Sequence, residues 1–155
     1  MVTIIAPGAG CGLQAPVGGS HNGLMRTNRS MPRDVLIPVL AYPSVPEAVE
    51  WLETAFGFRR RWVVEDHRAQ LAVGDDAAIM IVAGPPPPGS TDLVMVRVED
   101  LDAHLARAEE AGARVGLPGE FPHGARQYTA RDLAGRAWVF TESVADVAPG
   151  DWGAS

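Results

Sequence analysis

Residues 128–140 read Tyr-Thr-Ala-Arg-Asp-Leu-Ala-Gly-Arg-Ala-Trp-Val-Phe. Short apolar stretches stand on either side of Asp132 and Gly135. These two residue types provide the side-chain hydrogen bond and the positive φ that a tight turn needs. The segment therefore predicts a strand, a turn and a second strand, which close the second of two similar halves of the chain.

The first half begins with an apolar strand, expected at 35–42, followed by a helix. Ser44 is a candidate N-cap with Glu47 three residues later, as in a capping box, and Pro46 is tolerated in the first helical turn. Apolar residues at i, i+3, i+4 and i+7 spacing predict one buried stripe on this helix, which ends at Gly57. Three strands are expected next, at 58–65, 68–73 and 77–83.

The same order recurs after a segment with four consecutive prolines, which exclude a helix or a central strand. We expect a strand at 92–98, a helix from Asp100 to Ala111, and strands near 113–117, 127–131 and 136–141. Placing Ser44 on Asp100 aligns strand with strand and helix with helix, a repeat of about 56 residues. The sequence therefore predicts an α+β fold of two tandem βαβββ modules.

The predicted parts of the chain follow from this repeat. Residues 1–32 are rich in Gly, Pro, Ser and Asn without strand or helix periodicity, which indicates a flexible extension. Met25 or Met31 could equally be the natural start. The remaining parts are a first module at 33–84, a proline-rich linker at 85–90, a second module at 91–143 and a tail at 144–155.

Composition excludes several classes of function. The formal net charge of −6 argues against a nucleic-acid or anionic-membrane partner. No apolar run approaches the ~20 residues of a membrane-spanning helix. All 13 basic residues are Arg, which excludes lysine Schiff-base chemistry. The single Cys11 cannot form an internal disulfide or a cysteine-rich zinc site, so we expect a cytoplasmic protein.

Three groups of residues carry a family resemblance: the turn at 131–135, the segment 40–48 with Trp51 and Phe56, and Ala111-Gly112-Ala113. Together they resemble the vicinal oxygen chelate superfamily, which includes glyoxalase and bleomycin resistance proteins. The family commonly has Pro where Leu133 stands. The resemblance implies a curved mixed sheet around a cleft, helices on the outside, a pocket that needs both modules, and a homodimer.

The resemblance also implies where a metal would bind. Metal-dependent members use His, Gln or Glu side chains to hold a divalent metal that polarises vicinal substrate oxygens. Carried over to this chain, the four ligand positions fall on Ile37, Ile79, Leu93 and Val139. None of these side chains can ligate a metal. We therefore expect no metal at this site and no cofactor, and we assign no catalytic residue.

Polar candidates stand beside these apolar positions. Arg97 points to the same face of its strand as Leu93. A guanidinium on that face needs a partner, and a carboxylate of the ligand or of the protein would serve equally well. Arg126 and Tyr128 share one face of their strand. They could clamp an anion and stack on a ligand, but a surface Arg beside a core aromatic fits as well. The predicted ligand-binding set is Ile37, Ile79, Leu93, Arg97, Arg126, Tyr128 and Val139.

The histidines suggest no ligand pair with helical spacing. His67, in a predicted turn, and His104, near the start of the second helix, are expected at the surface. His123 lies in a loop that either overhangs a pocket or is simply solvated.

Three hypotheses follow. The preferred one is a metal-free small-molecule-binding protein of the glyoxalase/bleomycin resistance type that sequesters a drug or metabolite. The alternative is a metal-dependent or unorthodox enzyme of the lyase, isomerase or dioxygenase class, with a metal at Glu65, His67 or His123 or with metal-free acid–base chemistry. The third is a partner subunit whose sheet surface serves assembly.

Overall fold

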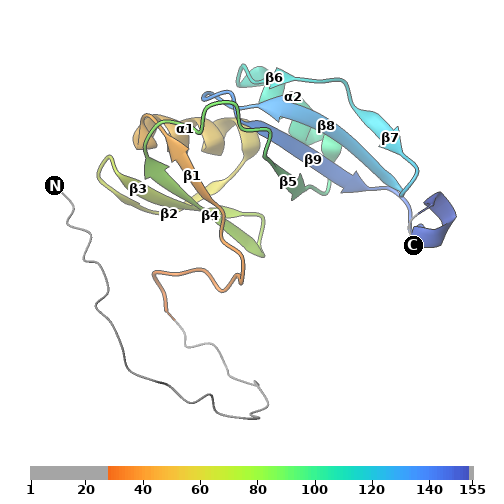
Figure 1. Ribbon diagram of the computed structural model, residues 1–155, viewed down its shortest axis with the longest axis horizontal. Helices are drawn as coiled ribbons and strands as arrows, with labels where there is room; N and C mark the ends of the chain where they lie inside the picture. The colour runs from red at the N-terminus through yellow and green to blue at the C-terminus, as the bar shows by residue number, and fades with distance from the viewer. Residues whose placement is uncertain (1–27, 154–155) are drawn as a thin grey trace, which may run out of the picture.

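The structure, a computed structural model, describes residues 28–153. The extension expected at 1–32 therefore lies almost entirely outside the described residues. The prediction of an α+β fold with two βαβββ modules is confirmed, and the two modules lie side by side (Figure 1). No helix among the described residues is long and apolar enough to cross a membrane.

The first module forms a four-stranded mixed sheet, sheet A, in the order β1-β4-β3-β2. β1 pairs with β4 in parallel, and the other neighbours are antiparallel. The elements are β1 (Val39–Tyr42), α1 (Val45–Phe56), β2 (Arg59–Val64), β3 (Arg68–Val73) and β4 (Ala77–Ala83).

The second module repeats this pattern as sheet B, in the order β5-β9-β8-β6, with β7 pairing with β8. Its elements are β5 (Leu93–Arg97), α2 (Leu101–Glu110), β6 (Arg114–Val115), β7 (Gly119–Phe121), β8 (Ala125–Arg131) and β9 (Ala137–Ser143). The sequence analysis missed β7 and the 3-10 turn η1 (Pro149–Trp152). Both are too short to produce a readable period.

Both helices begin at the predicted caps. The Ser44 hydroxyl accepts a hydrogen bond from the Glu47 amide at 3.4 Å, and Asp100 Oδ1 accepts one from the Ala103 amide at 2.9 Å. Helix α1 ends at Gly57, whose φ of 71° is the left-handed conformation that glycine adopts at low cost.

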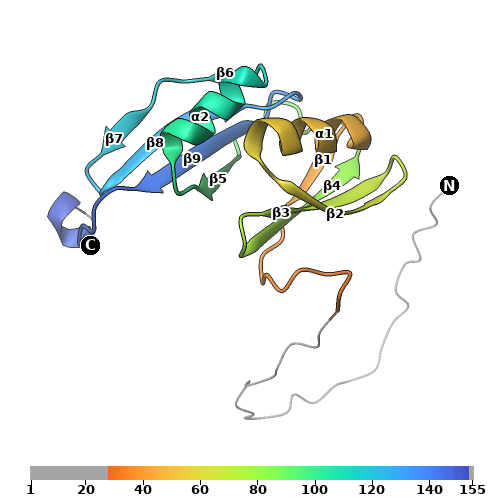
Figure 2. The same ribbon diagram turned by 180° about the vertical axis from the view of Figure 1, so that it is seen from behind.

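The two modules share one hydrophobic core. Each helix covers one face of its own sheet, and the two helices pack against each other (Figures 1 and 2). Phe56, at the end of α1, contacts Phe58 of its own module and both Trp138 and Phe140 of the other, with ring centroids 5.8, 5.5 and 4.7 Å away. Trp138 and Phe140 are fully buried in this core.

A polar junction reinforces this core at the turn between β8 and β9. Asp132 is buried, and its Oδ2 accepts hydrogen bonds from Tyr42 of the first module at 2.6 Å and from Trp138 at 2.9 Å. Its Oδ1 accepts from the amides of Ala134 and Arg136, both at 2.9 Å. Burial, and then the Asp132 charge, raise the pKa of Tyr42. The turn therefore closes a hairpin and also joins the modules.

Candidate functional site

The strand register separates two faces of sheet B. Val94 and Val96 pair with Trp138 and Phe140, whose side chains lie in the shared core. Successive side chains of a strand point to opposite faces. Leu93, Met95 and Arg97 therefore lie on the face away from α2, together with their partners Ala137, Val139 and Thr141. We call this the outer face of sheet B.

Large apolar side chains remain exposed on this outer face. Leu93 is 49% exposed and Met95 is 56% exposed, and both flank the half-buried Val139. Arg97 is exposed beside them and forms no hydrogen bond or ion pair within residues 28–153. An exposed apolar patch with a free cation at its edge is typical of a binding surface. Leu93, Arg97 and Val139 thus lie together, as the sequence parity predicted.

Two predicted apolar positions lie elsewhere. Ile79 is buried in the shared core opposite Leu71, and its neighbour Met80 takes the position on the outer face of sheet A. The sequence analysis expected Ile79 on the ligand-binding face of this strand, and this expectation is wrong by one residue. Ile37 precedes β1 and is half-buried.

Arg126 and Tyr128 also lie on the core side of their sheet, away from Leu93. Tyr128 pairs with Phe140 and is buried, and burial raises the pKa of its phenol. Arg126 forms a bidentate pair with Asp102 of α2, at 3.0 and 3.1 Å, which raises the pKa of Arg126 and lowers that of Asp102. Their expected position beside the apolar set is therefore corrected: both side chains bind to helix α2.

His104 is half-buried, although the sequence analysis expected it at the surface. Its Nε2 lies 3.1 Å from the carbonyl oxygen of Phe56, and its Nδ1 lies 2.6 Å from the Tyr128 hydroxyl. A carbonyl oxygen only accepts, so Nε2 carries the proton and Nδ1 accepts from Tyr128. Burial lowers the pKa of His104, and the positive charge of Arg107 lowers it further. A neutral imidazole thus joins the two modules.

This contact predicts a pH dependence of stability. The folded-state pKa of His104 lies below its unfolded value of about 6.5. The stability that the neutral imidazole contributes to the fold is therefore complete above pH 6.5, and it is lost as the pH falls through the lower folded-state pKa. We expect chemical denaturation at pH values from about 7.5 down to 5.5 to show that the free energy of unfolding falls more steeply for wild type than for His104→Gln. The difference in slope should be up to about 1.4 kcal/mol per pH unit. Equal slopes for wild type and His104→Gln would contradict the assignment.

The outer face of sheet A combines apolar side chains with a glutamine. Val39, Met80, Gln70 and Trp62 lie across from one another in neighbouring strands, and none belongs to the core-facing set of this sheet. Arg61 donates a hydrogen bond to Gln70 Oε1. Trp62 Nε1 donates to the carbonyl oxygen of Ser30 at 3.0 Å, which places the segment before β1 against this face.

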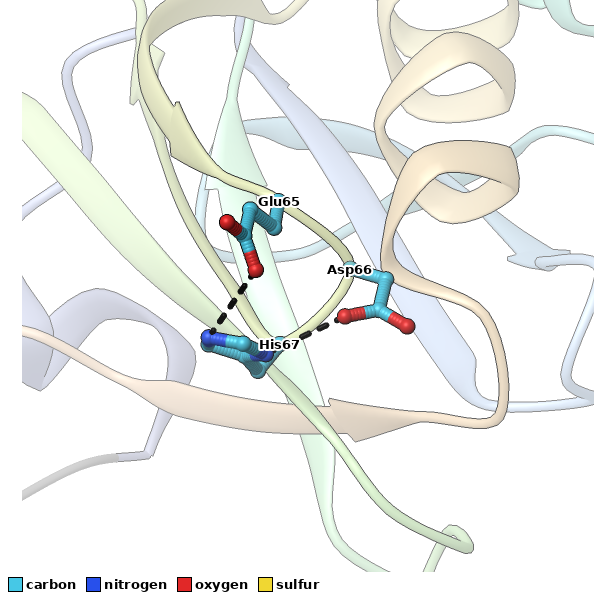
Figure 3. A group of neighbouring side chains, drawn as sticks. All are labelled: Glu65, Asp66 and His67. Carbon is cyan, nitrogen blue, oxygen red and sulfur yellow. Dashed lines mark hydrogen bonds and ion pairs between the residues drawn. The ribbon is translucent and has the colours of Figure 1, made fainter.

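One group of potential metal ligands lies at the β2–β3 turn. Glu65, Asp66 and His67 offer ligand atoms within 4.8 Å of one another, and Figure 3 shows their side chains turned toward the imidazole. The His67 ring is 3.1 Å from Asp66 and 4.0 Å from Glu65, and all three residues are exposed. The surface position predicted for His67 is confirmed. Such an exposed acidic turn is common without a metal.

His123, in the loop before β8, is half-buried between aromatic rings. Its ring centroid is 5.6 Å from those of Phe121 and Trp152, and its Nε2 lies 3.4 Å from the Gln127 amide nitrogen. Gln127 in turn reaches Thr141 on the outer face of sheet B at 3.3 Å. The loop therefore borders the outer face.

The family model for the Glyoxalase/Bleomycin resistance protein/Dioxygenase superfamily matches residues 35–140. The chain belongs to this superfamily. A comparison with curated protein sequences found no match.

Several solved structures resemble the chain over most of its length. TioX from Micromonospora sp. ML1 is 30% identical with a TM-score of 0.60, covering 73% of this chain and 98% of its own. The bleomycin-binding protein from bleomycin-producing Streptomyces verticillus, complexed with copper(II)-bleomycin, is 25% identical with a TM-score of 0.57, covering 69% and 93%. The fosfomycin resistance protein FosX from Mesorhizobium loti is 16% identical with a TM-score of 0.58, covering 72% and 93%, and shares the fold.

The resemblance implies four positions for metal ligands, and all four hold aliphatic side chains. Ile37, Ile79, Leu93 and Val139 are apolar, and the outer-face neighbour of Ile79 is Met80, whose thioether is a poor ligand for a hard divalent metal. These residues do not fit a divalent metal that binds through oxygen and imidazole ligands.

Proposed function

We propose that this chain binds a small, partly apolar molecule on the outer faces of its sheets, and so sequesters a drug or metabolite in the cytoplasm without catalysis. The observation that carries the proposal is the group of exposed apolar side chains, Leu93 and Met95, beside Arg97, which has no ion pair within residues 28–153. When the ligand covers apolar surface of the protein, each Å² removed from water contributes roughly 25 cal/mol to the free energy of binding. The guanidinium orients an anionic or carbonyl oxygen of the ligand.

The residue types favour binding over metal-assisted chemistry. The positions implied for metal ligands carry aliphatic side chains, which provide burial but no lone pairs for a metal. A similar protein of known structure, the bleomycin-binding protein at 25% identity, supports the same class of function. A bulky drug is therefore a reasonable ligand class for this chain.

A second copy of the chain would complete the site. The core-facing sides of both sheets share one core, so their outer faces lie on the outside of the single chain. A ligand pocket normally covers most of its ligand, which one open sheet face cannot do. In a homodimer, an outer face of one protomer would be covered by the other. Native mass spectrometry should give a particle of two chains.

A fluorescence titration tests the proposal. The probe is N-phenylnaphthylamine, a neutral apolar dye that becomes fluorescent when it leaves water. Wild type should bind it saturably, and the double variant Leu93→Glu with Met95→Glu should bind it at least about tenfold more weakly, because two carboxylates must then be desolvated.

Leu117→Glu is the matched control, because Leu117 is 95% exposed and lies outside the sheets. It should bind the dye as wild type does. Equal dye binding by wild type and the double variant would contradict the proposed surface. About one divalent metal per chain, in protein produced with Zn, Mn, Ni and Fe available, would instead favour the metal-dependent enzyme.

A further inference from the structure

The outer face of sheet A contains a buried donor for which residues 28–153 provide no acceptor. Gln70 of β3 lies opposite Trp62 and Met80 and is fully buried (0% exposed). Its amide nitrogen, Nε2, has no hydrogen-bond partner among the described residues. A buried amide without a partner is uncommon and destabilises the free protein, so each such group calls for an explanation.

The orientation of this amide follows from its neighbour. Arg61 donates to the Gln70 oxygen. Because a guanidinium has only donors, the opposite orientation of the amide would set N–H groups against N–H groups. The oxygen therefore faces Arg61, and Nε2 points to a place where nothing in the described chain accepts its protons.

A β-bulge explains why Arg61 stands beside Gln70. The register of β2 shifts between Arg60 and Trp62, so two residues of β2 face one residue of β3. Arg59 and Arg60 pair with Asp75 and Glu53 at 3.1 and 2.7 Å. Arg61 forms no ion pair within residues 28–153, and residues 1–27 contain no Asp or Glu. Its positive charge is thus available.

Trp62 adds a flat apolar surface next to these donors. It is half-buried, lies on the same face as Gln70 and is held by the 3.0 Å hydrogen bond to Ser30. An indole ring packs well against a planar ligand. Two kinds of free donor and one aromatic ring are therefore side by side.

We propose that Arg61, Gln70 and Trp62 form a subsite for a planar ligand that carries an anionic oxygen group, such as a carboxylate, sulfonate or phosphate. The guanidinium and Gln70 Nε2 donate to the oxygens, and the Trp62 ring packs on the planar part. Because Nε2 is covered in the free chain, the ligand reaches it after neighbouring side chains move. This subsite rests on the proposed function and specifies its ligand class.

The test compares two dyes that differ only in charge: anilinonaphthalene sulfonate and its neutral parent, N-phenylnaphthylamine. Arg61→Met should raise the Kd of the sulfonate about ten- to a hundredfold, since a charge-assisted contact is lost, and leave the Kd of the parent within about twofold. Arg59→Met is the control, because it makes the same change of net charge at an arginine that is already paired. It should leave the Kd of both dyes within about twofold of the wild-type values.

Gln70→Leu separates a binding role from a structural one. Leucine has a similar volume and no donor, so the free variant should be at least as stable as wild type, while its Kd for the sulfonate rises about tenfold. A less stable variant with unchanged sulfonate binding would overturn the subsite, because Gln70 would then be structural. Equal effects of Arg61→Met on both dyes would overturn it as well and leave the proposed function intact. Failure of wild type to bind either dye would contradict the proposed function itself.

Discussion

Replacement of Asp132 by alanine should lower the free energy of unfolding by about 3–5 kcal/mol. The buried carboxylate accepts four hydrogen bonds, from two side chains and two backbone amides. Alanine leaves the Tyr42 hydroxyl and the Trp138 indole N–H buried without an acceptor, and each such group costs about 1–3 kcal/mol. The turn also loses the bonds that hold its backbone.

The loss can be measured by urea denaturation of Asp132→Ala and Asp132→Asn. Asparagine keeps the size of the side chain, but its amide nitrogen cannot accept from the surrounding donors, so we expect an intermediate loss. Asp75→Ala is the control, since its ion pair with Arg59 is exposed and should contribute less than about 1 kcal/mol. A loss below about 1 kcal/mol for Asp132→Ala would show that the junction does not support the fold.

Truncation of Phe56 should have a similarly large effect. Its ring lies between the modules and contacts Phe58, Trp138 and Phe140. Removal of a fully packed aromatic side chain costs about 3–5 kcal/mol, because the lost burial is accompanied by a cavity. Phe56→Ala should therefore unfold at a markedly lower urea concentration than wild type, in one cooperative transition.

Phe121→Ala is the matched control, because Phe121 lies at the exposed end of β7. It should unfold within about 0.5–1 kcal/mol of wild type. If Phe56→Ala instead gave two separate transitions, the modules would be independently stable and the shared core would not be the main connection between them.

Much of the fold could be predicted because its signals are local. The caps at Ser44 and Asp100, the stop at Gly57 and the turn at Asp132 each depend on residues within one turn of chain. These signals set the repeat, and the repeat predicted the two modules. Helix α1 and strands β3 and β4 have the predicted limits.

The faces of the strands were harder to predict, because alternation shows which residues share a face but not which face is covered. Arg126 and Tyr128 share a face as expected, yet that face meets helix α2. Ile79 and Met80 are both apolar, so their composition gave no reason to choose between them. The covered face depends on where α1 and α2 pack, and this is a tertiary property.

The contact that His104 makes with the first module and the contact of Arg61 with Gln70 were not predicted, for related reasons. His104 sits at the edge of a helical stripe, where a surface position and a contact with the other module look the same in sequence. Arg61 belongs to a run of three arginines that suggests a solvated strand, and the bulge that turns it toward Gln70 leaves no sequence signal that we recognise. The proposed ligand class thus rests on the buried Gln70 amide, whose Nε2 has no hydrogen-bond partner among residues 28–153 and which carries no sequence signal.

The most direct test of the central claim is the titration of chelator-treated protein with N-phenylnaphthylamine. Our account predicts saturable binding that is the same before and after removal of divalent metals, and that is weakened at least about tenfold by Leu93→Glu with Met95→Glu. Binding that disappears with the chelator and returns with a divalent metal, or binding that is indifferent to the charges on the outer face of sheet B, would contradict it.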